Sequence, residues 1–258
     1  MTNKTDEMPI TSHLEELRRI LIVAFVTTFV FAIVAYIFSD KILALLIDPL
    51  KRVGHQIHYT GIVEPIFVKI KISLFTGFIA ALPVILWQVW SFVIPALKKN
   101  ERVYFTLFVL LSFICFLTGV SFCYFVIYQF GVVFLLGFAG PELNAILTID
   151  RFISFTMGFV IPFGFVFELP LIAYILSKMG IISYGFLAKH RRYAFFGIVC
   201  LAALITPPDV FTLLAVSGPV YLLFEISLTI MRLVERGKER ARRREEEAEK
   251  KADSVKAT

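Results

Sequence analysis

Three glutamates stand beside or within long apolar stretches of this sequence, where acidic side chains are unusual. Glu16 lies in SHLEELRR, directly before the first apolar run, and Glu101 lies in ALKKNERVYF between two later runs. Carboxylates at such a border suit a ligand that brings guanidinium groups followed by an apolar segment, because a guanidinium donates two parallel hydrogen bonds to one carboxylate. The apolar side chains expected beside them are Leu14, Leu17 and Phe92.

The third glutamate, Glu168, lies inside the apolar segment FVFELPL. An ionisable group within a hydrocarbon layer is costly and by default indicates a function. Pro170 follows two residues later and removes one backbone hydrogen bond from its helix. We therefore expect a bend at this point, which opens a concave and locally polar surface toward the bilayer.

Each of these glutamates also has a structural interpretation. Glu16 can form a surface ion pair with Arg19, three residues further along a helix. Glu101 follows Asn100 at the start of a helix, where the helix dipole favours an anion. Glu168 can be a protonated acid that is hydrogen-bonded to a neighbouring helix. The residue types alone leave these structural roles open.

The elements that must position these residues are membrane-spanning helices. The 258-residue sequence is 58% hydrophobic and 18% charged, a composition typical of a multi-span membrane protein. A helix needs about 20 apolar residues to cross the hydrocarbon layer, and lipid offers no partner for free peptide groups. The sequence therefore predicts an all-α, polytopic fold with six transmembrane helices. They are expected at about residues 20–38, 72–93, 103–138, 152–176, 193–205 and 210–231.

The basic residues predict how these helices are oriented. Most of the 26 Lys and Arg residues fall in alternate connecting segments, beginning with the N-terminal one, so both termini are expected in the cytoplasm. Glu16 and Glu101 then share the cytoplasmic face. Residues 1–236 are expected to form one transmembrane domain, in which helices five and six are short. The charged segment 237–258 is expected to be a disordered cytoplasmic tail.

Two connecting segments carry prolines at informative positions. The segment DKILALLIDPL, which contains Pro49, has the pattern of an amphipathic helix and predicts a packed cap between the first two spans. The segment LITPPDVF joins the two short helices. Its adjacent Pro207 and Pro208 make the turn rigid, and Asp209 is placed to cap the helix that follows.

Seven stretches in matching order resemble TatC, the receptor component of the twin-arginine protein translocase. They are HLEELRR, DPL, EPIFVKIKISLF, LPVILWQVWSFVIPALKKNER, FELPL, TPPD and LFEI. The resemblance extends to about Arg236. It implies a multi-pass protein of the bacterial cytoplasmic (inner) membrane, which accepts the paired arginines of signal peptides on already folded export cargo. It also implies assembly with single-span TatA and TatB proteins in a multi-copy complex that is powered by the proton-motive force.

The resemblance assigns roles residue by residue. Glu16 and Glu101 fall on the acidic positions of the signal-peptide site, and the surrounding motif contributes Arg18, Phe92 and Pro95. Glu168 falls on the intramembrane acid, where we expect it to bind a polar side chain of a partner helix. The remaining matched positions are Pro49 in the first loop and Asp209 in the last turn.

Two other function classes are weighed against the receptor. A proton-coupled secondary transporter would use Glu168 as its proton carrier. Such proteins usually show repeated halves and paired broken helices around a midplane site, and the sequence shows neither a repeat nor a second buried acid paired with Glu168. A purely structural membrane scaffold would leave Glu16 and Glu101 without a role. The sequence has no pair of a nucleophile and a general base, no phosphate-binding loop and no cluster of metal ligands. It therefore predicts no enzymatic activity, no cofactor, no metal and no nucleic-acid partner.

Overall fold

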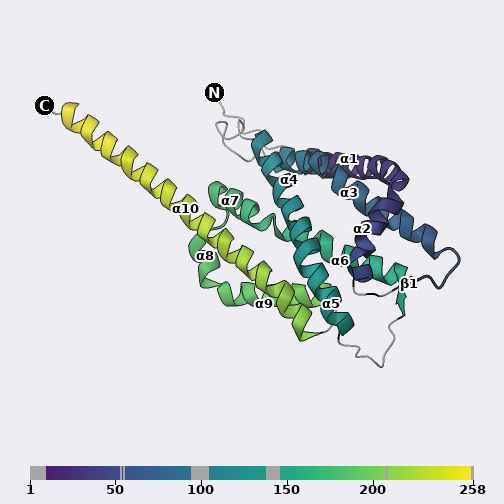
Figure 1. The fold of residues 1–258 in the computed structure, drawn as a ribbon. Helices are drawn as coiled ribbons and strands as arrows, with labels where there is room; N and C mark the ends of the chain where they lie inside the picture. Colours follow the sequence, from purple (N-terminus) through teal and green to yellow (C-terminus); the bar gives the residue numbers. More distant parts are fainter. Residues whose placement is uncertain are drawn as a thin grey trace. The chain divides into compact units, whose positions relative to one another are not determined.

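The computed structural model describes residues 10–52, 54, 56–93, 105–137, 146–206 and 209–256. These residues are mostly helical, which confirms the predicted all-α class (Figure 1). The chain divides into two compact units, Met1–Ile161 and Pro162–Thr258.

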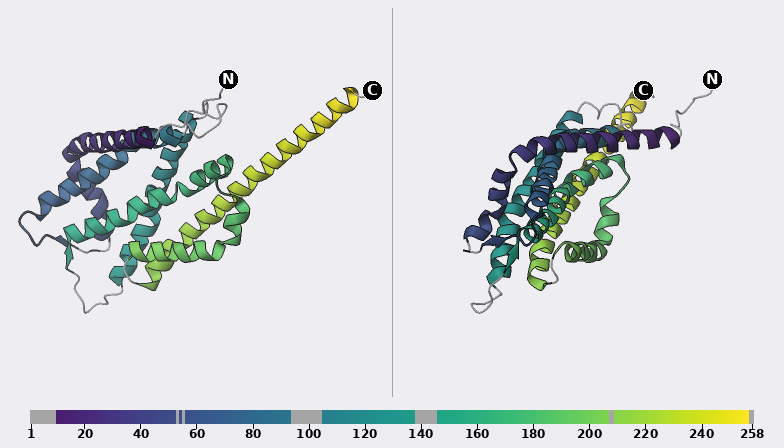
Figure 2. Two further views of the ribbon diagram at one scale, coloured as in Figure 1. Left: turned by 180° about the vertical axis from the view of Figure 1, so that it is seen from behind. Right: turned by 90° about the vertical axis from the view of Figure 1, so that its right-hand side faces the viewer.

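The first unit is built around a pair of long helices, α1 and α3, which lie side by side in every view (Figure 1, Figure 2). Its elements are α1 (Ile10–Ile37), α2 (Ser39–Arg52), β1 (Ile57–His58), α3 (Glu64–Val93), α4 (Phe105–Phe122), the π-helical turn η3 (Cys123–Tyr128), α5 (Gln129–Gly137), β2 (Leu147–Thr148) and most of α6 (Ile149–Val166). The strands β1 and β2 pair in parallel, Ile57 with Leu147 and His58 with Thr148.

A glycine allows α1 and α3 to approach closely. A Cβ atom placed on Gly77 of α3 would lie 2.5 Å from the backbone nitrogen of Ala32 in α1. Lipid tails are as apolar as the helix surfaces, so membrane helices associate through close van der Waals packing, which small residues permit. The contact at Gly77 is therefore the point that fixes this crossing.

The predicted amphipathic helix of the first connecting segment is present as α2. Its apolar face joins a buried cluster that collects side chains from α3, η3, α5 and α6. The cluster consists of Leu46, Leu50, Val68, Ile72, Tyr128, Val132, Phe152 and Ile153. Pro49 lies inside this helix, as the pattern of the segment predicted, and it is buried.

The second unit is organised along one long helix, α10. It contains the end of α6, α7 (Leu169–Met179), α8 (Tyr184–Lys189), α9 (Arg191–Ile205) and α10 (Val210–Lys256). Glu225 of α10 accepts a hydrogen bond from Tyr221 at 2.9 Å and pairs with Arg191 of α9 at 3.5 Å. Figure 2 shows the C-terminal part of α10, in yellow, extending beyond the other helices of its unit.

The helix α10 continues to Lys256, where the sequence predicted a disordered tail from residue 237. The segment is rich in Glu, Lys, Arg and Ala, which are strong helix formers, and Arg242 pairs with Glu246 one turn later at 3.1 Å. The preceding span supplies the first turns, so the extension does not carry the cost of starting a helix. The side chain of Lys238 also donates to the carbonyl oxygens of Ser177 and Lys178 at 2.8 Å each.

Within the described residues, five helical stretches are long and apolar enough to cross a membrane. They are Glu15–Ile37, Glu64–Ser91, Thr106–Gly137, Ile149–Met179 and Val210–Ala248. The helix expected as the fifth span is α9, which has 15 residues. At 1.5 Å per residue it is about 22 Å long, shorter than the hydrocarbon layer of about 30 Å.

Candidate functional site

The residues predicted to recognise paired arginines begin on the N-terminal part of α1. Glu16 and Arg18 are exposed, and Leu17 is 43% exposed. Leu14 also belongs to α1, and Phe92 lies in the last turn of α3. Glu101 and Pro95 lie outside the described residues, in segment 94–104 between α3 and α4.

Glu16 faces a polar pocket between the start of α1 and the end of α3. The pocket has a volume of about 220 Å³ and is lined by Glu16, Arg19, Ile20, Gln88 and Ser91. The Ser91 hydroxyl donates to the carbonyl of Gln88 at 2.8 Å. A carboxylate, an amide group and a hydroxyl thus line one opening, two turns or less before the segment that carries Glu101. Guanidinium donors match the carboxylate, amide and hydroxyl oxygens of this set, and one guanidinium, that of Arg19, already belongs to the lining.

Glu168 lies at a break in the helix that the sequence predicted to be bent. Pro170 has no N–H to donate to the carbonyl of Val166, and α6 ends at Val166 while α7 begins at Leu169. Glu168 is the N-cap residue of α7, and its carbonyl accepts from Leu171 and Ile172 at 3.0 and 2.9 Å. The residue is only 4% exposed, so this acid is buried.

Asp209 caps α10 as predicted. Its carboxylate accepts a hydrogen bond from the backbone N–H of Thr212 at 2.7 Å and another from the Thr212 hydroxyl. This contact satisfies an amide that has no partner within the helix. Pro207 and Pro208 lie outside the described residues.

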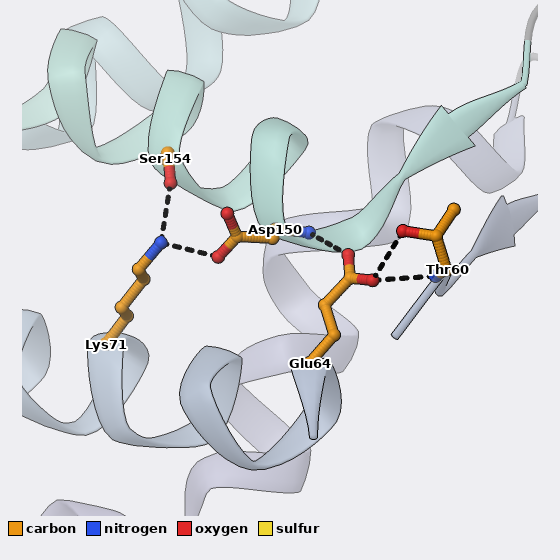
Figure 3. Close-up of polar contacts among 5 residues, drawn as sticks. All are labelled: Thr60, Glu64, Lys71, Asp150 and Ser154. Atoms are coloured by element: carbon orange, nitrogen blue, oxygen red, sulfur yellow. Dashed lines mark hydrogen bonds and ion pairs between the residues drawn. The ribbon is translucent and has the colours of Figure 1, made fainter. Parts of the chain in front are cut away.

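The structure joins five polar residues of the first unit that the sequence did not single out (Figure 3). One oxygen of Glu64 accepts from the Thr60 amide at 2.7 Å, from the Thr60 hydroxyl at 3.1 Å and from the Gly61 amide at 3.1 Å. Its other oxygen accepts from the Asp150 amide at 3.1 Å. A single carboxylate therefore caps the turn before α3 and the first turn of α6.

Lys71 completes this network on the same face of α3, two turns after Glu64. Its ammonium group donates to the Asp150 carboxylate and, at 3.1 Å, to the Ser154 hydroxyl. Both members of the ion pair are about 40% exposed, so the pair contributes at most about 1 kcal/mol. The sequence offered one signal, a charged residue just before each of two different apolar runs, but it did not indicate that residues 79 positions apart would pair.

Comparison with known proteins decides the family of this chain. Residues 12–219 match the family model described as Sec-independent protein translocase protein (TatC). The chain belongs to the TatC family. A TatC protein of Carboxydothermus hydrogenoformans is 39% identical over 228 residues, which cover 88% of this chain and 94% of that protein. A TatC protein of Aquifex aeolicus is 37% identical over 235 residues, which cover 90% of this chain and 98% of that protein.

The fold agrees with this assignment. A solved chain, described as the crystal structure of the twin-arginine translocase receptor TatC, superposes with a TM-score of 0.79 at 36% identity. The match covers 86% of this chain and 99% of that chain. This TatC-family chain is thus a multi-pass protein of the bacterial inner membrane and a component of a protein translocase. The resemblance recognised in the sequence is confirmed.

Proposed function

We propose that this chain is the receptor subunit that binds the twin-arginine motif of signal peptides on folded precursor proteins. In this proposal the chain crosses the membrane six times, and α9 is the short fifth span. Both termini lie in the cytoplasm, so that the pocket at Glu16 faces the incoming signal peptide. The name of the solved relative, a twin-arginine translocase receptor, supports the assignment.

The observation that carries the proposal is the exposed carboxylate of Glu16 in a polar pocket at the ends of two long helices. One guanidinium of the motif binds Glu16, and the next binds Glu101 in the segment that leaves α3. Arg18 and Pro95 complete the surrounding motif. The apolar part of the signal peptide then follows the exposed apolar surface that begins at Leu17. Leu14 and Phe92 are the other apolar residues that we assign to this site.

The same proposal includes assembly with single-span partners of the TatA and TatB types in a multi-copy complex, in which the proton-motive force drives export. Glu168 is the group we assign to partner docking. It is a buried acid at a helix break beside Pro170, and a protonated carboxyl can donate a hydrogen bond to a polar side chain of a partner helix.

A photocrosslinking experiment tests the receptor assignment. A photoreactive residue replaces Ser91, which lines the pocket. Crosslinking to a twin-arginine signal peptide is then measured in membranes that contain the parent chain, the Glu16→Ala variant or the Glu101→Ala variant. Each substitution is expected to reduce the yield by about tenfold, the effect of losing one charge-assisted pair worth about 1.4 kcal/mol.

Glu15→Ala is the matched control, since Glu15 is also exposed on α1 but projects about 100° away from Glu16 around the helix. Its crosslinking yield should equal that of the parent chain. Unchanged yields with both Glu16→Ala and Glu101→Ala would reject the receptor assignment.

A further inference from the structure

Pro49 creates an unusual acceptor within α2. In a continuous helix the carbonyl of Leu45 would accept from the amide of residue 49. Proline has no N–H, and its ring also pushes against the carbonyl four residues earlier. The Leu45 carbonyl thus loses its normal partner, although α2 continues through Arg52.

A tyrosine from a distant part of the chain supplies the missing donor. The hydroxyl of Tyr124 donates to the Leu45 carbonyl oxygen at 2.7 Å, across 79 positions of sequence. Tyr124 belongs to the π-helical turn η3, and π-helical turns occur frequently at functional sites. The hydroxyl therefore replaces the amide of residue 49 as the hydrogen-bond donor to the Leu45 carbonyl.

A second tyrosine makes a similar contact without a proline beneath it. Tyr128 stacks on Tyr124 with ring centroids 5.8 Å apart, and its hydroxyl donates to the Leu46 carbonyl at 3.1 Å. That carbonyl has the amide of Leu50 as its normal helical partner. The two tyrosines thus lie in the same element, stack on each other and donate to the same helix. They differ in one respect: the Leu46 carbonyl has a backbone amide as an alternative donor, and the Leu45 carbonyl does not.

We propose that Tyr124 is a positioning residue for α2: its hydroxyl replaces the amide that Pro49 lacks and fixes α2 on η3 in the arrangement that export requires. This role is independent of the signal-peptide site. Leu46 and Leu50 bury their side chains in the cluster with Tyr128, which holds the apolar face of α2. The Tyr124–Leu45 contact adds the hydrogen bond that the backbone of α2 lacks at Pro49.

A double-mutant cycle tests the proposal by amide hydrogen exchange in α2, with the full chain in lipid nanodiscs. Tyr124→Phe keeps the ring and removes the hydroxyl, and should speed exchange of the α2 amides about fivefold, since a lost hydrogen bond is worth about 1 kcal/mol. Pro49→Ala restores an amide at residue 49. In the Ala background Tyr124→Phe should change exchange less than about twofold, because the new amide takes the Leu45 carbonyl. The cycle cancels effects of losing the proline ring itself.

Tyr128→Phe is the matched control, and its effect on exchange should be the same with Pro49 and with Ala at that position. A second readout is export of a twin-arginine precursor into inverted membrane vesicles, which should fall with Tyr124→Phe and recover when Pro49→Ala is added. An equal effect of Tyr124→Phe in both backgrounds would overturn the proposal. Full export by the Tyr124→Phe protein, together with faster exchange of its α2 amides than in the parent chain, would also overturn the proposal.

Discussion

At the scale of single residues, this chain uses glutamates of the same chemistry for different purposes. Both oxygens of Glu64 are occupied by donors from two helix starts, whereas Glu16 is exposed beside a pocket. A carboxylate whose oxygens already accept hydrogen bonds from the backbone stabilises the fold, whereas a carboxylate that lines an open pocket is available to bind a ligand. Substitutions at the two positions should therefore affect different measurements.

The first prediction concerns Glu64→Gln. Glutamine keeps the shape but replaces one acceptor oxygen with an NH₂ group, which must then face an N–H donor from Thr60 or Asp150. We expect the midpoint of thermal unfolding of the purified protein to fall by about 2–4 °C. Glu15→Gln, at an exposed position, serves as the control and should leave it unchanged. A midpoint for Glu64→Gln equal to that of the control would contradict the double-capping role.

A second prediction separates the possible roles of Glu168. If it acts as a neutral hydrogen-bonding group at the break before Pro170, Glu168→Gln should retain most precursor export in membrane vesicles. Glu168→Leu removes every polar atom and should reduce export by about tenfold or more, the effect of one lost buried hydrogen bond of about 1.4 kcal/mol. Equal loss in both variants would instead favour proton transfer by this carboxyl.

Residue identity alone could suggest these glutamates but not distinguish their roles. The sequence indicated a function for Glu16, Glu101 and Glu168 because acidic residues are rare beside or within apolar runs. Glu64 did not, since its function depends on Asp150, which the chain brings beside it only after folding. Asp209 was predictable because its capping contact is local, three residues away.

At the scale of elements, the closest approach of two helices depends on one missing side chain. Gly77 lies against the Ala32 backbone, and a Cβ there would meet its nitrogen at 2.5 Å and its Cα at 2.6 Å. Backbone atoms cannot move aside as a flexible side chain can. The pairing of α1 with α3, and with it the pocket at Glu16, therefore depends on this glycine.

The third prediction is that Gly77→Val separates α1 from α3. We expect a loss of about 1–3 kcal/mol in the free energy of unfolding, measured by denaturant titration of the purified protein. Gly158→Val in α6 controls for the β-branched side chain, because a Cβ at Gly158 has no atom within 4 Å. Equal losses from the two substitutions would show that the close approach does not determine the stability of this helix pair.

Local signals predicted the elements well where sequence neighbours decide the structure. The amphipathic pattern predicted α2, and Pro170 predicted the break between α6 and α7, because a missing N–H acts on its own helix. The helix beyond Arg236 was missed because charge composition also suits a disordered segment, and its anchor is the contact of Lys238 with the end of α7. Such a contact between distant segments leaves no local pattern.

At the scale of the whole molecule, the family assignment rests on order as much as on content. The matched motifs spread from HLEELRR to LFEI along nearly the whole chain, and the family match covers residues 12–219. Hydrophobicity alone predicted a multi-span helical protein. It could not predict that the chain is a translocase component, because that assignment required several motifs to occur in one sequence in the same order.

The most direct test of the receptor assignment compares binding of two signal peptides, one with Arg-Arg and one with Lys-Lys, to the protein in lipid nanodiscs. Lysine presents a point charge and arginine a planar fork that matches a carboxylate, so the parent chain should bind the Arg-Arg peptide about tenfold more tightly, a difference of about 1.4 kcal/mol. In the double variant Glu16→Ala/Glu101→Ala the difference should fall below about twofold. Equal binding of both peptides by the parent chain, or an arginine preference that persists in the double variant, would contradict recognition by these two carboxylates.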